Sequence, residues 1–533
     1  MTHPADFPWL TTALLLPLVG AVVVLLLPKG PAGERTDSAR PQQVALGFSL
    51  VTLVLTVVIA SKFDTGVSGF QLEEKHTWIA GFGAYYALGV DGIGLTLVLL
   101  TTILTPVVLL ASWHDGVRPA TVAQAPGQAA ARWSSNAFFA WLLALEGLAI
   151  GVFAATDVFL FYVLFEATLF PVYFLIGGFG GLRRSYAATK FLIFSLLGGL
   201  VMLASVIGLY VVSAKSSSGP TYFLPDLAPI MQNVDTNLGR WLFLGFFIAF
   251  AIKAPMFPVH TWLPDAADEA TPGTSVMLVS VLDKIGTFGM IRFCLGLFPE
   301  ASRWATPVVL VLAVISVLYG ALVAIGQRSI PRLIAYTSVS HFGFIVLGIF
   351  VMNSQGQVGS TLYMFNHGLS TGLLFLVTGF LITRRGSRLI PDFGGVQSVA
   401  PWLAGIFLVA GLSSLSLPGL SPFVSEFLVL TGTFVHNWWY AAFAVLGIVL
   451  AAVYILLMYQ RTMTGPVRPS IQGMRDLGGR ELAAVAPLVV LIIGFGFFPK
   501  PLTDVIAPAV KSTLSHVGKQ DPAPTVTQEA AQP

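Results

Sequence analysis

Residues 248–293 read IAFAIKAPMFPVHTWLPDAADEATPGTSVMLVSVLDKIGTFGMIRF. Two long apolar runs flank a short polar link, and each run carries a lysine, Lys253 or Lys284, which hydrocarbon surroundings penalise. Pro255 and Pro258 follow the first lysine and remove helical hydrogen bonds there. The freed carbonyl groups need water or side chains as partners inside a membrane. The stretch therefore predicts two membrane helices, of which the first is interrupted and hydrated beside its lysine.

The composition of the whole chain agrees with a membrane protein. Of 533 residues, 55% are hydrophobic and only 10% are charged, against about 45 to 50% and about 25% in soluble domains. Apolar runs of about 18 or more residues recur about fourteen times, and each can cross a hydrocarbon core of roughly 30 Å. They start near Leu10, Leu46, Leu88, Phe138, Asp157, Tyr186, Trp241, Thr274, Pro307, Ile330, Thr361, Trp402, Tyr440 and Leu482. Backbone groups in lipid must pair within each segment, so we expect an all-α bundle.

A second interrupted helix resembles the first in kind. The twelfth run contains SLPGLSPFVSEF, where Pro418, Gly419 and Pro422 precede the ionisable Glu426 in mid-span. The two interruptions lie five helices apart, so they face opposite sides of the membrane, as in transporters built from inverted repeats. We therefore predict two inverted five-helix repeats, helices 4 to 8 and helices 9 to 13, with helices 7 and 12 broken.

The expected organisation divides one membrane unit into five parts. Helices 1 to 3 occupy residues 1–135, the first repeat 136–300, the second repeat 301–465 and the last helix 466–506. The first helix has no basic leader before it, so we expect it to remain uncleaved. From about Ala507 to residue 533 the apolar periodicity is lost, which predicts a polar tail that is peripheral or disordered.

The distribution of basic residues predicts the orientation in the membrane. They collect in the links after the first, third, fifth, ninth, eleventh and thirteenth helices: Lys29, Arg35, Arg40, Arg118, Arg132, Arg183, Arg184, Arg328, Arg332, Arg384, Arg385, Arg388, Arg461, Arg468, Arg475 and Arg480. Links rich in lysine and arginine stay on the cytoplasmic side, so both termini are expected outside. The link after the seventh helix, 265–270 (DAADEA), is acidic instead. Acidic residues weigh little in this rule, so the predicted topology stands.

Several classes of site are excluded by the sequence. The single cysteine, Cys294, makes neither an intrachain disulfide nor a four-cysteine iron–sulfur cluster. The glycine-rich GGFGGLRR after the fifth helix has neither the spacing nor the strand of a nucleotide-binding loop. No histidine pair shows metal-ligand spacing, and we expect no metal, no cofactor and no nucleic acid on this chain. Energy for any uphill transport must come from a partner or from an ion gradient.

Four ionisable residues lie in mid-span: Glu166, Lys253, Lys284 and Glu426. A charge at the bilayer centre costs about 2.5 to 3.5 kcal/mol, so such groups are functional candidates. The alternative is structural, for example a protonated Glu166 bonded to a neighbouring helix. Opposite charges about 7 Å apart attract by roughly 2 to 3 kcal/mol at a dielectric constant near 20, while moving one charge through 100 mV takes about 2.3 kcal/mol. One ion pair is thus strong enough to load or unload a proton.

Weaker candidates accompany these four residues. His260, His341 and His367 can each donate from one ring nitrogen and accept at the other, as a proton relay requires. A core histidine bonded to a serine or a carbonyl group explains them equally well. Glu146 is a further possible relay, although it can also be a buried structural acid.

The motifs that contain these residues carry a family resemblance. The chain is similar, from about Gly89 to Arg461, to the antiporter-like membrane subunits of respiratory complex I, the proton-pumping NADH-quinone oxidoreductase. The matching stretches include DVFLFYVLFEATLFPVYFLIGGFGG, AFAIKAPMFPVHTWLPDAADEATPGTSVMLVSVLDKIGTFGMIRF, RLIAYTSVSHFGFIVLG, NHGLSTGLLFL and LPGLSPFVSEFLVL. Glu426 favours the M type, the counterpart of mitochondrial NADH dehydrogenase subunit four, because the L and N types usually carry a lysine in that helix.

The resemblance implies roles for residues and partners. Glu166 would pair with Lys253, Lys284 would be the central connecting base, and Glu426 the distal acid. FMN, iron–sulfur clusters and quinone would belong to partner subunits, L-type and N-type chains would lie on either side, and the location would be a bacterial plasma membrane. Ser329 and Pro331 stand where the family commonly has aspartate and lysine, which leaves a local contact at that turn open.

Two alternatives follow from the same residues. A subunit of a multi-chain sodium/proton antiporter or of a membrane-bound hydrogenase shares this ancestry and motif set. A structural membrane scaffold, in which the charges only hold helices together, belongs to a different class. Four deep ionisable groups and two interrupted helices argue against the scaffold.

Overall fold

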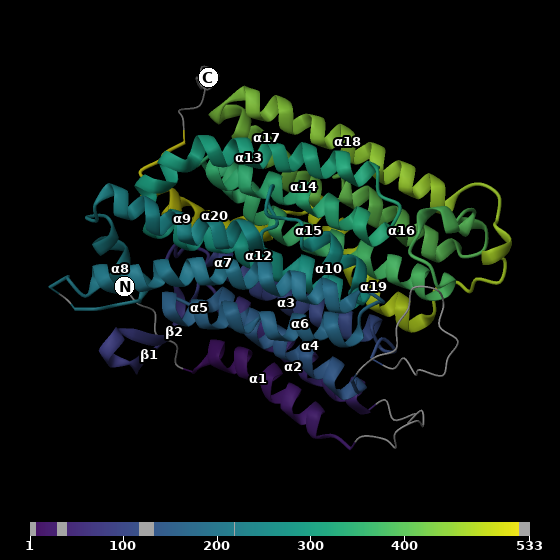
Figure 1. Cartoon of the computed structure of the whole chain (residues 1–533), viewed down its shortest axis with the longest axis horizontal. Helices are drawn as coiled ribbons and strands as arrows, with labels where there is room; N and C mark the ends of the chain where they lie inside the picture. The colour runs from purple at the N-terminus through teal and green to yellow at the C-terminus, as the bar shows by residue number, and fades with distance from the viewer. Residues whose placement is uncertain (1–6, 29–39, 117–132, 218, 522–533) are drawn as a thin grey trace, which may run out of the picture.

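Helices make up most of the computed structural model, as satisfaction of backbone groups in lipid requires (Figure 1). The structure describes residues 7–28, 40–116, 133–217 and 219–521. Four basic residues used to predict the topology, Lys29, Arg35, Arg118 and Arg132, lie outside these ranges, as do residues 522–533 of the expected tail.

The helices follow one another along the chain with short connections. The first group is α1 (Trp9–Leu26), α2 (Arg40–Ser61), α3 (Gly92–Ala111), α4 (Ser135–Ala154), α5 (Val158–Ala167), α6 (Leu169–Phe179), α7 (Arg184–Ser213), α8 (Leu224–Met231) and α9 (Thr236–Lys253). The middle group is α10 (Leu263–Glu269), α11 (Pro272–Val276), η2 (Met277–Leu282), α12 (Asp283–Gly289), η3 (Met290–Leu295), α13 (Pro299–Ile325), α14 (Ile330–Phe350) and α15 (Ser354–Arg385). The last group is α16 (Pro401–Ser414), α17 (Ser421–His436), α18 (Trp438–Met463), α19 (Gly479–Phe497) and α20 (Lys500–Val517), and short 3-10 turns occur at η1 (Ala80–Phe82), η4 (Ile390–Asp392), η5 (Val396–Ser398) and η6 (Pro469–Ile471).

Within the described ranges, twelve helical stretches are long and apolar enough to cross a membrane. They coincide with twelve of the fourteen expected runs, and the two that are left over are the seventh and the twelfth. Those two are interrupted: α9 ends at Lys253 before α10 begins at Leu263, and α16 ends at Ser414 before α17 begins at Ser421. The all-α membrane fold is thus confirmed, while the count of fourteen and the inverted repeats stay predictions.

The chain progresses across the bundle from one edge to the other. In Figure 1, α1 and α2 lie at one edge and α17 and α18 at the opposite edge. The 32-residue helix α15 lies between them and packs against α3, α11, α14, α16, α17, α19 and α20. From Gly356 to Leu381 nearly every residue of α15 is buried, so this helix is the core of the bundle.

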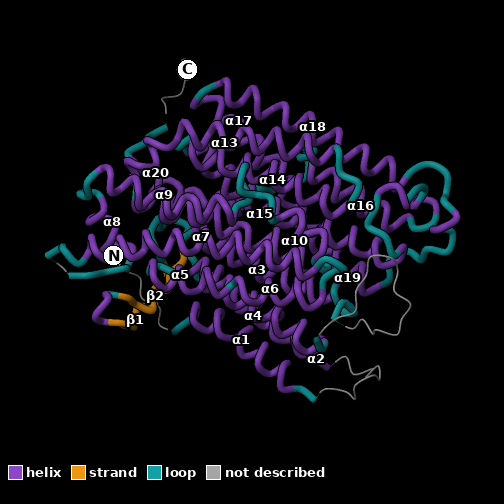
Figure 2. The backbone as a smooth tube through the Cα atoms, viewed as in Figure 1, coloured by secondary structure: helices purple, strands orange, loops and turns teal. Residues whose placement is uncertain are grey.

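A small β-hairpin, which the hydrophobic pattern did not predict, lies at one end of the bundle (Figure 2). Strands β1 (Gln71–Ile79) and β2 (Ala84–Val90) pair antiparallel, and Gly83 adopts a left-handed conformation in the turn. Glu74 of β1 accepts a hydrogen bond from the backbone N–H of Leu10 at 2.7 Å, which places a carboxylate at the N-terminus of α1. Residue 88, where the third run was expected to start, therefore belongs to a strand.

The carboxy-terminal boundary differs from the prediction. We expected apolar periodicity to be lost from about Ala507, but α20 continues to Val517. Its buried residues are Leu502, Ile506, Ala509, Val510, Leu514 and Val517, which recur at helical spacing and pack against α3 and α15. The sequence analysis missed this pattern because the stripe is narrow and the rest of the helix is polar.

Candidate functional site

The first interruption follows from the missing N–H of Pro255. Because Pro255 cannot donate, the carbonyl group of Ala251 accepts instead from the backbone N–H of Met256 at 3.0 Å, five residues on. The next carbonyl group, of Ile252, accepts from the indole N–H of Trp262 at 2.9 Å. The freed carbonyl groups of α9 are thus satisfied by a distorted turn and by a side chain.

The loop that continues from this point contains Pro258 and His260. The backbone N–H of Phe257 donates to the hydroxyl of Ser316 on α13 at 2.9 Å. The imidazole of His260 is almost fully buried, packs edge-on against Tyr319 with ring centres 5.1 Å apart, and has no hydrogen-bond partner for either nitrogen among the described residues. Both nitrogens of His260 are therefore available to exchange a proton.

Lys253 ends α9 and lies inside the bundle. Only 1% of its surface is exposed, and its ammonium group finds no hydrogen-bond partner in the described part of the chain. The rings of Phe165 and Phe191 lie 5.3 and 5.5 Å from the Lys253 nitrogen. Glu166, the residue after Phe165 on α5, interacts electrostatically with Lys253, and so does Asp283 of α12. The expected pair of Glu166 and Lys253 is therefore brought together by α5 and α9.

Glu166 occupies a space that a glycine of α7 leaves open. A Cβ atom built at Gly199 would lie 1.8 Å from Oε1 of Glu166 and 2.6 Å from its Cδ. Oε1 is buried without a hydrogen-bond partner among the residues described. The Glu166 carboxyl group thus packs directly on the backbone of α7, and any side chain at position 199 would displace it.

Lys284 lies in an unusual helix, in which two π-helical segments, η2 and η3, enclose the short α12. Its ammonium group lies 2.7 Å from the carbonyl oxygen of Val279 and 2.7 Å from Nδ1 of His367 on α15. When the ammonium donates, Nδ1 of His367 accepts, so the ring proton resides on Nε2. Nε2 has no partner among the described residues, and the ring of His341 on α14 lies 5.2 Å away, centre to centre. Three of the expected residues, Lys284, His367 and His341, therefore form one cluster.

Glu426 on α17 lies beyond this cluster. It is 5% exposed and interacts electrostatically with Tyr363 of α15 and Tyr454 of α18. The ring of Tyr363 also lies 5.9 Å from that of His341, centre to centre. Tyr363 therefore connects the histidines with Glu426. The sequence analysis missed both tyrosines, because a tyrosine in an apolar run resembles ordinary core packing.

The second interruption separates α16 from α17. Pro418 and Gly419 lie in the loop, where Gly419 has φ +92°, and the N–H of Leu417 donates to the carbonyl group of Leu412, again five residues back. Pro422 lies in the first turn of α17, where proline is well tolerated, so it starts that helix rather than interrupting it. Both interruptions thus contain the same widened turn.

Glu146 lies apart from the other candidates. It is fully buried on α4, and neither carboxyl oxygen has a hydrogen-bond partner within the described ranges. Its neighbour across the helix interface is Thr105 of α3. The interactions described above do not connect Glu146 to the lysines.

The acidic link that broke the charge pattern is neutralised by its neighbours. Asp265 is 2.6 Å from Lys190 and 2.5 Å from Arg332. Burial favours the neutral acid, but the hydrogen bonds from Lys190 and Arg332 outweigh it and hold the pKa of Asp265 below 3.8. Asp268 accepts a hydrogen bond at 2.5 Å from Ser329. The serine that replaces the family's usual aspartate at this turn therefore makes a contact with the acidic link.

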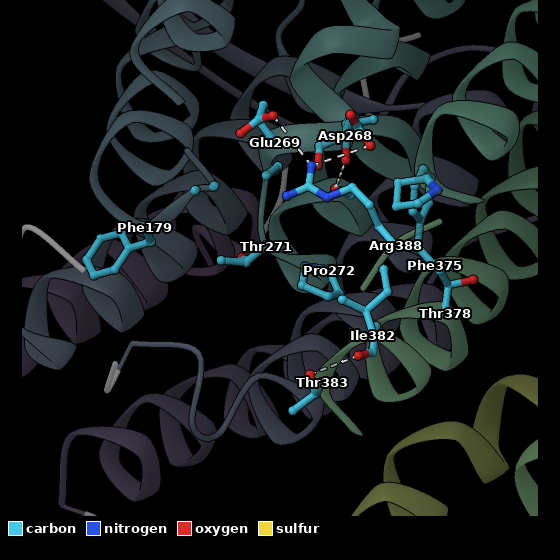
Figure 3. A pocket seen from close by; sticks show the side chains of 17 residues that line it. Phe179, Asp268, Glu269, Thr271, Pro272, Phe375, Thr378, Ile382, Thr383 and Arg388 are labelled. Atoms are coloured by element: carbon cyan, nitrogen blue, oxygen red, sulfur yellow. Dashed lines mark hydrogen bonds and ion pairs between the residues drawn. The ribbon is translucent and has the colours of Figure 1, made fainter. Parts of the chain in front are cut away.

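Figure 3 shows the rest of this acidic clasp, which we define as Asp265, Asp268 and Glu269 with their partners. The guanidinium group of Arg388 lies 3.4 Å from Asp268 and 3.5 Å from Glu269, and Arg183 lies 3.6 Å from Glu269. A cavity of about 50 Å³ beside them is lined by apolar side chains of α11 and α15 and by these charged groups, which is room for a few water molecules. The link is acidic because basic residues of three other links surround it.

Comparisons with known proteins agree with this geometry. Residues 155–451 match a family model described as "NADH:quinone oxidoreductase/Mrp antiporter, TM". The chain is 52% identical to NADH-quinone oxidoreductase subunit M of Mycobacterium tuberculosis strain CDC 1551 / Oshkosh, over 98% of this chain and 96% of that protein. It is 31% identical to a chain of respiratory complex I from Thermus thermophilus with bound NADH, over 96% of this chain and all of that one, with a TM-score of 0.84.

A more distant structure shares the fold alone. A chain of the Mrp complex from Dietzia sp. DQ12-45-1b has a TM-score of 0.80 over 95% of this chain and 98% of that one, but only 20% identity. Similarity to the M subunits is much higher and extends over almost the whole chain. The chain therefore belongs to the family of antiporter-like membrane subunits of NADH-quinone oxidoreductase, and within it to the M subunits.

Proposed function

We propose that this chain is the M-type, proton-translocating membrane subunit of an NADH-quinone oxidoreductase. The observation that supports this most directly is the line of buried ionisable groups through the bundle. Glu166 and Lys253 lie at one end, Lys284, His367 and His341 in the middle, and Glu426 at the other end. Such a line is costly in a membrane protein and is kept where protons or ions move.

In the proposed mechanism, Glu166 alternates between pairing with Lys253 and pairing with a neighbouring subunit. When Glu166 turns away, the Lys253 ammonium group loses its counter-charge and releases its proton more readily. The proton passes to Lys284 and then, through His367 and neighbouring groups, toward Glu426 for release on the outer side. His260 and Glu146 are possible further relays. Redox chemistry in other subunits drives the cycle, so this chain is part of a translocase and holds no redox centre.

The assembly follows from the same proposal. FMN, the iron–sulfur clusters and quinone belong to partner subunits, and L-type and N-type antiporter-like chains flank this one. The complex lies in a bacterial plasma membrane with both termini of this chain outside. The paired acidic link supports that orientation, because Asp265, Asp268 and Glu269 neutralise the basic residues on the side assigned to the cytoplasm.

Two alternatives remain distinguishable by experiment. A subunit of a sodium/proton antiporter or of a membrane-bound hydrogenase would co-purify with a different set of chains and would not pump protons with NADH. A structural scaffold would keep its function after the buried charges are neutralised. The level of identity to M subunits favours the oxidoreductase over the first alternative.

Proton pumping by inverted membrane vesicles tests the proposal. NADH oxidation and acidification of the vesicle interior are measured together for the wild type and for Lys253→Ala, and assembly is checked by native gel electrophoresis. We expect an assembled complex whose proton uptake is lost. An assembled Lys253→Ala complex that pumps at the wild-type rate would refute the role of the buried line.

A further inference from the structure

Asp283, the first residue of α12, is a buried carboxyl group that the mechanism above does not use. Its side chain is completely buried, and neither of its oxygens has a hydrogen-bond partner among the residues that the structure describes. A buried carboxylate without such partners is expensive to keep charged. Groups of this kind are candidates for proton exchange when a specific charged neighbour faces them.

The face of α12 that carries Asp283 packs against the interrupted end of α9. Gly286 follows one turn later, and a Cβ atom there would lie 2.6 Å from the backbone nitrogen of Ala254 and 2.6 Å from the carbonyl oxygen of Phe250. Residues three apart share one face of a helix. Asp283 is therefore turned toward the end of α9, where Lys253 lies next to Ala254.

The next residue, Lys284, points to a different neighbour. Consecutive residues are about 100° apart around a helix, and the Lys284 ammonium group reaches His367 of α15 at 2.7 Å. The carboxyl group of Asp283 interacts electrostatically with both Lys284 and Lys253. One acid thus faces the two lysines that the proton must link, and its segment is bounded on both sides by π-helical turns, which occur frequently at functional sites.

We propose that Asp283 is a proton-transfer residue between Lys253 and Lys284, an inference that rests on the proposed function. In the first step an N–H bond of the Lys253 ammonium breaks, its electron pair stays on nitrogen, and an O–H bond forms on Asp283. In the second step that O–H bond breaks, the carboxylate is restored, and the neutral amine of Lys284 becomes an ammonium. The two transfers move one proton between the lysines and need no further reactant.

The test uses the complete complex in inverted vesicles with variants at position 283. Asp283→Asn and Asp283→Leu remove the exchangeable proton, the first with a similar shape and the second with an apolar side chain that needs no hydrogen bonds. Asp283→Glu restores a carboxyl group. Thr287→Val is the matched control, because Thr287 is a buried polar residue of the same helix that does not titrate. Lys253→Ala is measured in parallel.

We expect Asn and Leu at position 283 to lower the proton-pumping rate at least about tenfold, within the range that a positioned acid–base group contributes. Glu should recover a large part of the rate, and Thr287→Val should leave it unchanged. Infrared difference spectra of the assembled complex, reduced against resting, should contain a carboxyl C=O band that is absent in Asp283→Asn.

Each outcome decides one question. If Lys253→Ala stops pumping while Asp283→Asn and Asp283→Leu pump as the wild type does, Asp283 is not on the path and the proposed function stands. If Lys253→Ala itself pumps normally, the proposed function fails first. If neither Asn nor Leu assembles and only Glu does, the carboxyl group is a structural counter-ion, and the inference is overturned.

Discussion

A methyl group added at position 199 tests whether the position of the Glu166 carboxyl group matters. In Gly199→Ala the new Cβ atom would lie 1.8 Å from Oε1 of Glu166, whereas ordinary contact begins at 3.4 Å. The group that must move is the end of a flexible side chain, not backbone. We therefore expect α7 to stay in place and the carboxyl group to leave its position.

Two opposing effects set the magnitude. Alanine is favoured over glycine inside a helix by about 0.5 to 1 kcal/mol, and overfilling a packed site costs about 1 to 3 kcal/mol. The net change in folding stability is therefore small, about 1 to 2 kcal/mol. Misplacing a positioned group by about 1 Å can slow the step it serves about 100-fold. Gly199→Ala should thus impair proton pumping much more than it impairs assembly.

The assay measures NADH-driven proton pumping and thermal unfolding of the assembled complex. Gly198→Ala is the matched control, because it changes the neighbouring glycine of α7 and its Cβ atom would meet nothing closer than 3.2 Å. Glu166→Asp shortens the acid by one methylene and provides room for the methyl group. If position 199 acts through Glu166, adding Gly199→Ala to Glu166→Asp should cost little further activity. Equal losses in both backgrounds, or no loss in either, would refute the reasoning.

Two further predictions concern the loop and link that follow α9. Trp262→Phe removes the indole that donates to Ile252, leaves a buried carbonyl group without its partner, and should destabilise the protein by about 1 to 3 kcal/mol; an unchanged unfolding temperature in a thermal melt would contradict this. Asp265 has a lowered pKa because Lys190 and Arg332 stabilise its charged form against burial, so its contribution to stability is present above its unfolded pKa of about 4 and is lost as the pH falls through the lower folded value. Asp265→Asn should therefore flatten the acid side of a stability-against-pH curve, and a curve that keeps its wild-type slope would show that this residue does not contribute.

The two interrupted helices are where local sequence was most informative. Pro255 and Pro418 cannot donate backbone hydrogen bonds, so an interruption follows from their covalent structure. The charged candidates were found for a similarly local reason, because Glu166 and Lys253 lie too deep in apolar runs to be surface residues. Both inferences need only the residue and its neighbours along the chain.

Features that depend on packing between distant segments were not predictable. The contact of Lys284 with His367 joins residues 83 apart, and no periodicity signals it. The π-helical segments beside Asp283 depend on how α12 packs against α9. The hairpin containing Glu74 was missed because the search followed apolar runs of membrane length, and a short paired strand leaves no such run.

The acidic clasp also bears on the order in which the protein is made. Its carboxylates on Asp268 and Glu269 are synthesised about 120 residues before Arg388, which contacts both of them. Until α15 has left the ribosome, these two acids have only part of their final set of cationic partners. This end of the bundle therefore closes late, after ten of the expected helices have already been placed in the membrane. Chain elongation and closure of the cytoplasmic end are thus coupled, and nascent chains stopped before residue 388 should remain open to proteases at this link.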